Sequence, residues 1–268
     1  MKKIIPLLLT AALALSLAAC GAPGTESVEL TVFAAASLQE TLDQVIAAYR
    51  EIAPDVTVTP TYDSSGTLKT QIQEGAACDL FLSAAQKQMN QLDASRDAAG
   101  GNTEGLDFVL QGTRVDLLEN KVVLAVPDAN PAGIQSFSDL GTEKLRLLCI
   151  GNEDVPVGAY SLEILTALGI RDALERGGKL TYGSNVKEVT TQVKEGTVDA
   201  GIIYATDAFS AGLTVADRAG SDLCRQVIYP AAVLNTTEHE KAAKDFLAFL
   251  RGDAAMRIFA SVGFAPAA

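Results

Sequence analysis

Apolar and polar residues alternate over residues 28–33, and apolar residues then recur at helical spacing over residues 38–49. This change of period predicts a strand followed by a helix. The same order repeats downstream, and strands that alternate with helices indicate an α/β sheet. The further elements predicted in this half are strands at 56–62 and 80–82 and helices at 67–74 and 86–92.

A second α/β unit is predicted after residues 93–112, which are rich in Gly, Asp and Asn and are expected to form a surface excursion. Regular patterning resumes at 121–126, just before Pro127. The remaining predicted elements are strands at 145–150, 200–204 and 226–234 and helices at 159–168, 186–195, 238–250 and 254–260.

Two lobes are expected if the C-terminal residues 227–268 pack on the first α/β unit. We then expect residues 28–121 together with 227–268 to form lobe 1 and residues 122–226 to form lobe 2. The chain would cross between the lobes twice, and a ligand cleft would lie between them. The apolar runs at 122–126 and 227–234 are the natural candidates for paired hinge strands.

The N-terminus has the order of an export signal, with Lys2 and Lys3 before an apolar run and small residues. The run contains Pro6 and is shorter than the roughly 20 residues of a membrane-spanning helix, so a permanent span is the weaker interpretation. We predict a signal peptide over residues 1–19. Residues 17–20, Leu-Ala-Ala-Cys, resemble the bacterial lipobox, which implies a lipid on Cys20, a tether over residues 20–27 and a site outside the cytoplasmic membrane.

Charge and cysteine content exclude several other functions. The formal charge of −12 disfavours nucleic acid as a partner. With Cys20 assigned to lipid, Cys78, Cys149 and Cys224 remain, an odd number without CxxC or Cys/His spacing, so metal and redox sites are disfavoured. Three free thiols are favoured, with a disulfide between two of them left open. The single histidine, His239, lies in a charged helix start, so we predict no catalytic residues and no enzyme.

Four predicted helix starts offer hydrogen-bond donors that could surround one anion. Ser37 with Glu40 has a capping-box pattern, and Ser64-Ser65-Gly66 opens the next helix. The other two starts are Val155-Pro156-Val157-Gly158 and Ser184-Asn185-Val186. Helix N-termini carry unpaired N–H groups and attract anions, and strand-to-helix turns gather at one edge of a sheet. The alternative is that each turn only caps its own helix.

Five segments, in order along the chain, resemble the molybdate-binding proteins of ABC transporters. Cys78 departs from the pattern, because relatives often carry proline there. The segments are residues 31–38 (TVFAAASL), 64–68 (SSGTL), 75–84 (GAACDLFLSA), 155–158 (VPVG) and 201–204 (GIIY).

The resemblance implies a two-lobed type II periplasmic-binding-protein fold that closes on molybdate or tungstate. It implies that neutral donors hold this oxyanion, with no direct side-chain coordination of the metal and no cofactor. The implied ligand-binding residues are Ser37, Ser65, Val157, Val186 and Tyr204. The implied partners are an ABC permease and its ATPase, with the chain itself a monomer.

Two alternatives to this function are left open. The same fold binds other oxyanions, such as sulfate or phosphate, or ferric complexes, although iron sites usually use paired tyrosines. A surface lipoprotein with a purely structural role is the other alternative, and it predicts no stabilisation by any small ligand.

Overall fold

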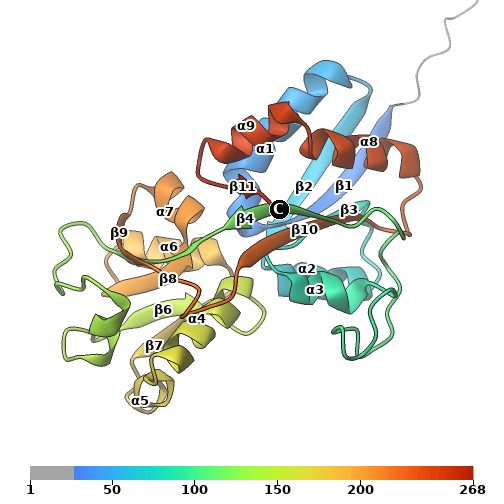
Figure 1. The fold of residues 1–268 in the computed structure, drawn as a ribbon. Helices are drawn as coiled ribbons and strands as arrows, with labels where there is room; N and C mark the ends of the chain where they lie inside the picture. Colours follow the sequence, from blue (N-terminus) through green and yellow to red (C-terminus); the bar gives the residue numbers. More distant parts are fainter. Residues whose placement is uncertain (1–26, 268) are drawn as a thin grey trace, which may run out of the picture.

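Two sheets, each covered by helices on both faces, make up the two lobes of the protein (Figure 1). The computed structural model describes residues 27–267. The predicted α/β fold with two lobes is confirmed. The predictions of a signal peptide and of a lipid on Cys20 lie outside the described residues. Within residues 27–267, no helix combines the length and the apolar character needed to cross a bilayer.

The larger sheet has the strand order β11-β4-β10-β3-β1-β2. Pro60 is tolerated in β2 because this strand lies at the edge of the sheet. Helices α1, α8 and α9 lie on one side of the sheet and α2 and α3 on the other (Figure 1). The bounds are β1 (Val28–Ala35), α1 (Gln39–Ile52), β2 (Val56–Asp63), α2 (Ser65–Gln73), β3 (Leu80–Leu82), α3 (Gln86–Leu92), β4 (Val115–Asn120), β10 (Val227–Val233), α8 (Glu240–Leu250), α9 (Asp253–Ala260) and β11 (Ala265–Pro266).

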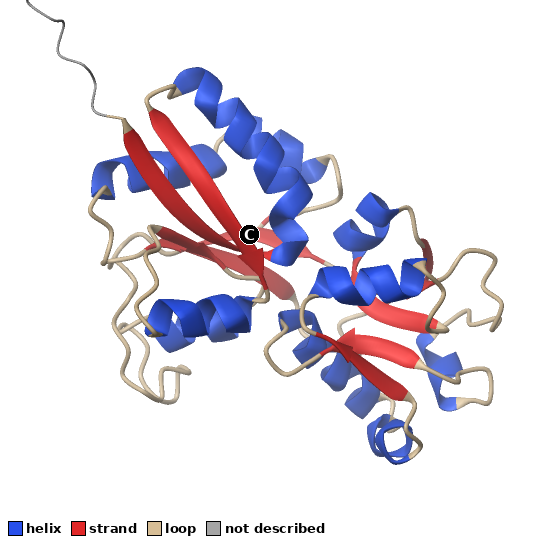
Figure 2. Cartoon of the chain, turned by 180° about the vertical axis from the view of Figure 1, so that it is seen from behind, coloured by secondary structure: helices blue, strands red, loops and turns tan. Residues whose placement is uncertain are grey.

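The smaller sheet has the order β7-β6-β8-β5-β9. Every residue of β5 and β8 is buried, which explains why both read as continuous apolar runs. Figure 2 shows the helices on the two faces of this sheet from behind. The bounds are β5 (Val122–Val126), η2 (Phe137–Gly141, a short 3-10 helix), β6 (Leu148–Gly151), α4 (Pro156–Ala167), α5 (Arg171–Arg176), β7 (Leu180–Gly183), α6 (Val186–Lys194), β8 (Ala200–Tyr204), α7 (Ala205–Ala211) and β9 (Thr214–Arg218). A second short 3-10 helix, η1 (Ala36–Leu38), lies between β1 and α1 of lobe 1.

The chain passes between the sheets at Lys121 and again between β9 and β10. The expected pairing of segments 122–126 and 227–234 is wrong. β5 pairs with β8 and β9, whereas β10 pairs with β3 and β4. Strand β4 was not predicted, because Asp116 and Glu119 interrupt its apolar residues. In the structure, β4 is the strand that lies beside β10.

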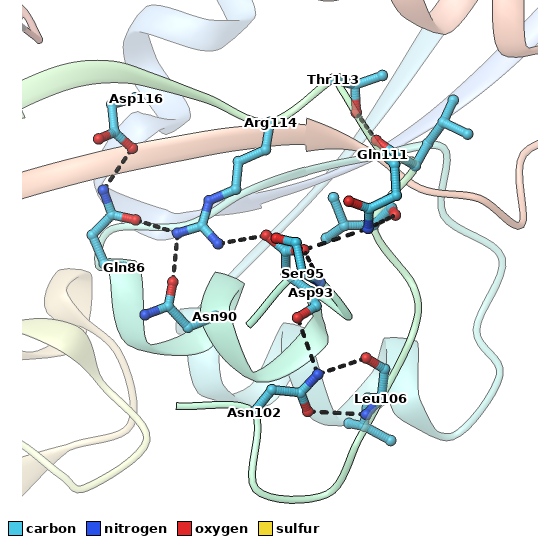
Figure 3. A network of polar contacts seen from close by, with 12 residues as sticks. Gln86, Asn90, Asp93, Ser95, Asn102, Leu106, Gln111, Thr113, Arg114 and Asp116 are labelled. Atoms are coloured by element: carbon cyan, nitrogen blue, oxygen red, sulfur yellow. Dashed lines mark hydrogen bonds and ion pairs between the residues drawn. The ribbon is translucent and has the colours of Figure 1, made fainter. Parts of the chain in front are cut away.

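Hydrogen bonds fix the course of the excursion at residues 93–112 (Figure 3). The Arg114 guanidinium donates to Asp93 Oδ2 at 2.8 Å and to side-chain oxygens of Gln86 and Asn90 on α3, both at 2.5 Å. Deeper in the excursion, the Asn102 amide bonds the backbone of Asp93 and Leu106. The side chains of Asp93 and Arg114 are only 3% and 13% exposed, so this ion pair is largely shielded from solvent.

Candidate ligand-binding site

A small cavity lies between the two lobes, where strands end and helices begin. Lobe 1 contributes the turns after β1, β2 and β3, and lobe 2 contributes the starts of α4 and α6 and the end of β8. The lining residues are Ala35, Ala36, Ser37, Asp63, Ser64, Ser65, Ala84, Val155, Pro156, Val186 and Tyr204. Four of the five predicted binding residues are therefore brought together here, and the fifth, Val157, follows Pro156 directly.

Ser37 is buried in η1, directly after β1, and its Oγ lies 2.8 Å from the Tyr229 hydroxyl. The expected capping box of Ser37 with Glu40 is wrong. Ser37 lies within η1, and Leu38 is the N-cap of α1 without a side-chain cap. The Asn120 amide donates to the Tyr229 hydroxyl at 3.3 Å, so Tyr229 is free to donate to Ser37. Ser37 then retains its own hydrogen for a group in the cavity.

In the turn between β2 and α2, one serine caps the helix and the adjacent serine is available as a donor. Ser64 is the N-cap of α2, and its Oγ accepts from the Thr67 amide at 3.1 Å. Ser65 is fully buried, and its Oγ accepts from the Ala84 amide at 2.9 Å. Because a hydroxyl that accepts from an amide keeps its hydrogen, Ser65 can donate into the cavity.

In lobe 2, the starts of two helices lie at the cavity. Val155 is the N-cap of α4 and Pro156 its first residue, so the Val157 amide falls in the first turn, where it has no partner within the helix. Asn185 caps α6 by accepting from the Glu188 amide at 3.1 Å. The amide of Val186 is likewise in a first turn. Both ends carry the positive pole of a helix dipole.

Tyr204 ends β8 with a buried hydroxyl that makes no hydrogen bond within residues 27–267. Burial raises the pKa of this phenol well above its ordinary value, so it stays protonated and can donate. The neighbouring Tyr229 hydroxyl is engaged by Ser37 and Asn120. Since a buried unpaired hydroxyl is costly, a hydrogen-bond acceptor in the cavity would satisfy Tyr204.

The lobes meet closely beside the cavity. The Gly66 amide of α2 donates to the Asp154 carbonyl of lobe 2 at 3.0 Å. A Cβ on Gly66 would lie 2.4 Å from that oxygen, so only glycine permits this approach. The cavity has about 10 Å³ of free space, which is room for one water. A larger guest therefore requires the lobes to lie further apart.

Two charged residues near the site were not predicted as functional. Lys187 follows Val186, and its ammonium lies 3.0 Å from Asp207 Oδ1 in lobe 2 and 2.6 Å from Glu40 Oε2 in lobe 1. Burial raises the pKa of Asp207 to about 6, and Lys187 offsets only part of that effect. Burial opposes the charge on Lys187, but the attraction of Asp207 and Glu40 prevails and its pKa is raised. The sequence places Asp207 three residues after Tyr204, without a pattern that marks it as buried.

The chemistry of the cavity suits a small anion held by hydrogen bonds. Hydroxyls from both lobes and first-turn amides from lobe 2 supply donors, and no Lys or Arg lines this cavity in the described part of the chain. Asp63 is the charged lining residue, and its carboxylate accepts from the Ser64 amide at 2.7 Å. His239 lies exposed at the N-cap of α8, away from the lining residues.

Comparison with known proteins places this architecture in a family. Residues 30–265 match the family model of the bacterial extracellular solute-binding proteins. A Bacillus subtilis chain named as an ABC transporter substrate-binding lipoprotein, YvgL, is 36% identical, with 89% of this chain and 87% of that one covered. The molybdate-binding protein ModA of Haemophilus influenzae is 31% identical, with 94% and 95% covered.

Solved structures agree on the fold. The periplasmic molybdate-binding protein of Azotobacter vinelandii superposes with a TM-score of 0.76 at 23% identity, over 88% of this chain and 98% of that one. The sulfate-binding protein SubI of Mycobacterium tuberculosis has a TM-score of 0.70 at 20% identity, over 89% and 87%. Membership implies a small-molecule ligand and a permease with its ATPase as partners. The chain belongs to the bacterial extracellular solute-binding proteins, as a ModA-like, extracytoplasmic substrate-binding protein of ABC transporters.

Proposed function

We propose that this chain captures molybdate, and tungstate equally, and delivers it to an ABC permease. The observation that carries the proposal is the Tyr204 hydroxyl, which is buried in a cavity between the lobes and has no partner within residues 27–267. Together with the hydroxyls of Ser37 and Ser65 and the amides of Val157 and Val186, it forms a set of neutral donors. An oxyanion accepts from all of them.

The energies of these groups are sufficient without a buried cation. A hydrogen bond to a charged acceptor contributes roughly 1.5 to 3 kcal/mol, so five donors contribute about 8 to 15 kcal/mol before the costs of ordering and closure. Micromolar to nanomolar binding corresponds to about 8 to 12 kcal/mol. A buried lysine would add a large desolvation cost, which a neutral site avoids.

The choice of molybdate over other ligands of the fold rests on the relatives and on the site. The similar chains include named molybdate-binding proteins over nearly their whole length. SubI shares the fold, so the fold alone does not distinguish sulfate. We expect size to discriminate, since a smaller anion would not reach donors in both lobes. A ferric site is disfavoured, because Tyr204 lines the cavity while Tyr229 is engaged by Ser37.

The proposal also includes the anchor and the absence of catalysis. We propose that a lipid on Cys20 holds the protein at the outer face of the cytoplasmic membrane, in line with the lipoprotein named among its relatives. Replacement of Cys20 by Ala would then release the protein from the membrane fraction. We propose a binding role without catalysis, in line with the binding proteins named among its relatives.

Ligand-dependent melting and calorimetry test the proposed ligand. Purified protein is titrated with molybdate, tungstate, sulfate and phosphate at matched ionic strength. Molybdate and tungstate are expected to raise the melting temperature and to bind with similar affinity, because they are nearly the same size. Stabilisation by sulfate or phosphate alone would assign another oxyanion, and no response to any of the four would favour the structural role.

A further inference from the structure

Lys187 is the charged centre of a contact between the lobes that lies outside the ligand cavity. Its ammonium contacts both Glu40 carboxylate oxygens, at 2.7 and 2.6 Å, and Asp207 Oδ1 at 3.0 Å. Glu40 is in the first turn of α1 in lobe 1. Lys187 and Asp207 are in the first turns of α6 and α7 in lobe 2. None of the three residues lines the cavity.

The two contacts of Lys187 differ in what they join. Asp207 and Lys187 belong to the same lobe, so their contact persists when the lobes separate. Glu40 belongs to the other lobe, so its contact exists only while the lobes are closed. The Asp207 side chain is 0% exposed, whereas Lys187 is 25% and Glu40 47% exposed. The buried carboxylate is therefore the fixed point that directs Lys187 toward the cleft.

We propose that the Glu40–Lys187 pair is an affinity-determining contact that stabilises the closed form, and that Asp207 is the residue that positions Lys187 for it. Lys187 also follows Val186, which lines the cavity at the start of α6, so movement of this helix start toward a ligand brings Lys187 toward Glu40. The inference rests on closure around a ligand and not on molybdate being that ligand.

The burial of each partner predicts different effects of removing it. Loss of Glu40 removes only a half-exposed partner, so the lobes keep their stability and the closed form alone is weakened. Loss of Lys187 leaves Asp207 buried without its counter-charge, which destabilises lobe 2 as well. Asp207 also interacts electrostatically with Tyr204 and Tyr229, whose hydroxyls are buried and uncharged. These neighbours give Asp207 no substitute cation.

Four variants separate an affinity role from a structural one, with molybdate as the probe. The variants are Glu40→Gln, Lys187→Met, Lys187→Met with Asp207→Asn, and Glu175→Gln as the control. Glu175 pairs with Arg171 at 2.9 Å within α5 of lobe 2, and neither residue lines the cavity. Affinity is measured by calorimetry at low and at about 0.5 M salt, and melting is measured without molybdate.

We expect Glu40→Gln to weaken molybdate binding roughly two- to fivefold at low salt with unchanged melting, and the difference to shrink at high salt. Lys187→Met is expected to lower both affinity and melting temperature. The double variant regains the melting temperature of the wild type but not its affinity. Wild-type affinity in Glu40→Gln, or recovery of affinity in the double variant, would overturn the inference.

X-ray scattering without any ligand tests the ion pair even if the protein does not bind molybdate. If the wild type does not bind molybdate, the radius of gyration still reports the closed fraction. A larger radius for Glu40→Gln than for the wild type and Glu175→Gln would support the pair even then. Equal radii for all three, together with absent molybdate binding, would refute both proposals.

Discussion

Replacement of Gly66 by Ala tests whether contact between the lobes determines affinity. The Gly66 amide donates to the Asp154 carbonyl across the cleft at 3.0 Å. A Cβ at this position would lie 2.4 Å from that oxygen and 2.8 Å from the Asp154 Cα and Cβ. The clash is therefore with backbone of the opposite lobe and cannot be relieved by rotating a side chain. The nearest atoms to this Cβ all belong to Asp154 of lobe 2.

The expected loss of affinity in Gly66→Ala is the sum of two effects on the closed form. The hydrogen bond contributes about 1 kcal/mol, and overpacking costs about 1 to 3 kcal/mol. Their sum, about 2 to 4 kcal/mol, corresponds to a roughly 30- to 700-fold weaker affinity. In the absence of ligand the melting temperature should stay equal or rise, because alanine favours a helix over glycine by up to about 1 kcal/mol.

Gly158→Ala supplies the contrast, since a Cβ there would lie 2.4 Å from the Gly151 and Asn152 carbonyls of its own lobe. That variant should lower the melting temperature, whereas Gly66→Ala should not. Calorimetry with molybdate, melting and X-ray scattering are measured for both. Wild-type affinity in Gly66→Ala, or a loss of melting temperature equal to that of Gly158→Ala, would show that the reasoning about closure is wrong.

Three further predictions concern the donors and the excursion. Ser37→Ala and Ser65→Ala should each weaken molybdate binding about 10- to 100-fold with little change in folding, and calorimetry that shows unchanged affinity in both would contradict the site. Tyr204→Phe should weaken binding similarly while melting without ligand is unchanged or higher, because an unpaired buried hydroxyl is removed. Asp93→Asn should lower stability by about 3 kcal/mol in denaturant titration. Burial opposes ionisation of Asp93, but hydrogen bonds from Ser95 and Arg114 prevail and lower its pKa. The wild type should therefore lose this stability as the pH falls from about 4 through the folded pKa, and Asp93→Asn should lack that acid-dependent loss.

The sequence predicts the strand-to-helix turns of the site because each turn has a local signal. The period of apolar residues changes from two to 3.6 at such a turn, and Ser64 and Asn185 are caps within their own segments. The clustering of these turns in one cavity follows from the order of the strands, which a single turn does not contain. The resemblance supplied that order, and with it the expected binding roles of Ser37, Ser65, Val157, Val186 and Tyr204.

Contacts between distant residues are what the sequence hides. Glu40 is read as a capping residue from its spacing to Ser37, yet its carboxylate is used by Lys187, 147 positions away. Strand β4 is missed because Asp116 and Glu119 interrupt the apolar pattern expected of a buried strand. Asp207 follows Tyr204 in a segment without a recognisable period, so neither its burial nor its counter-charge is predictable locally.

Two tyrosines that meet between the lobes allow lobe motion to be followed optically without a label. Tyr204 of lobe 2 and Tyr229 of lobe 1 stack edge to face with ring centroids 5.8 Å apart. The chain contains no tryptophan and only six tyrosines, so ultraviolet emission comes from few rings and is not masked by indole. Separation of the lobes would change the coupling of this pair, and tyrosine fluorescence or near-ultraviolet dichroism should follow the motion in the unlabelled protein.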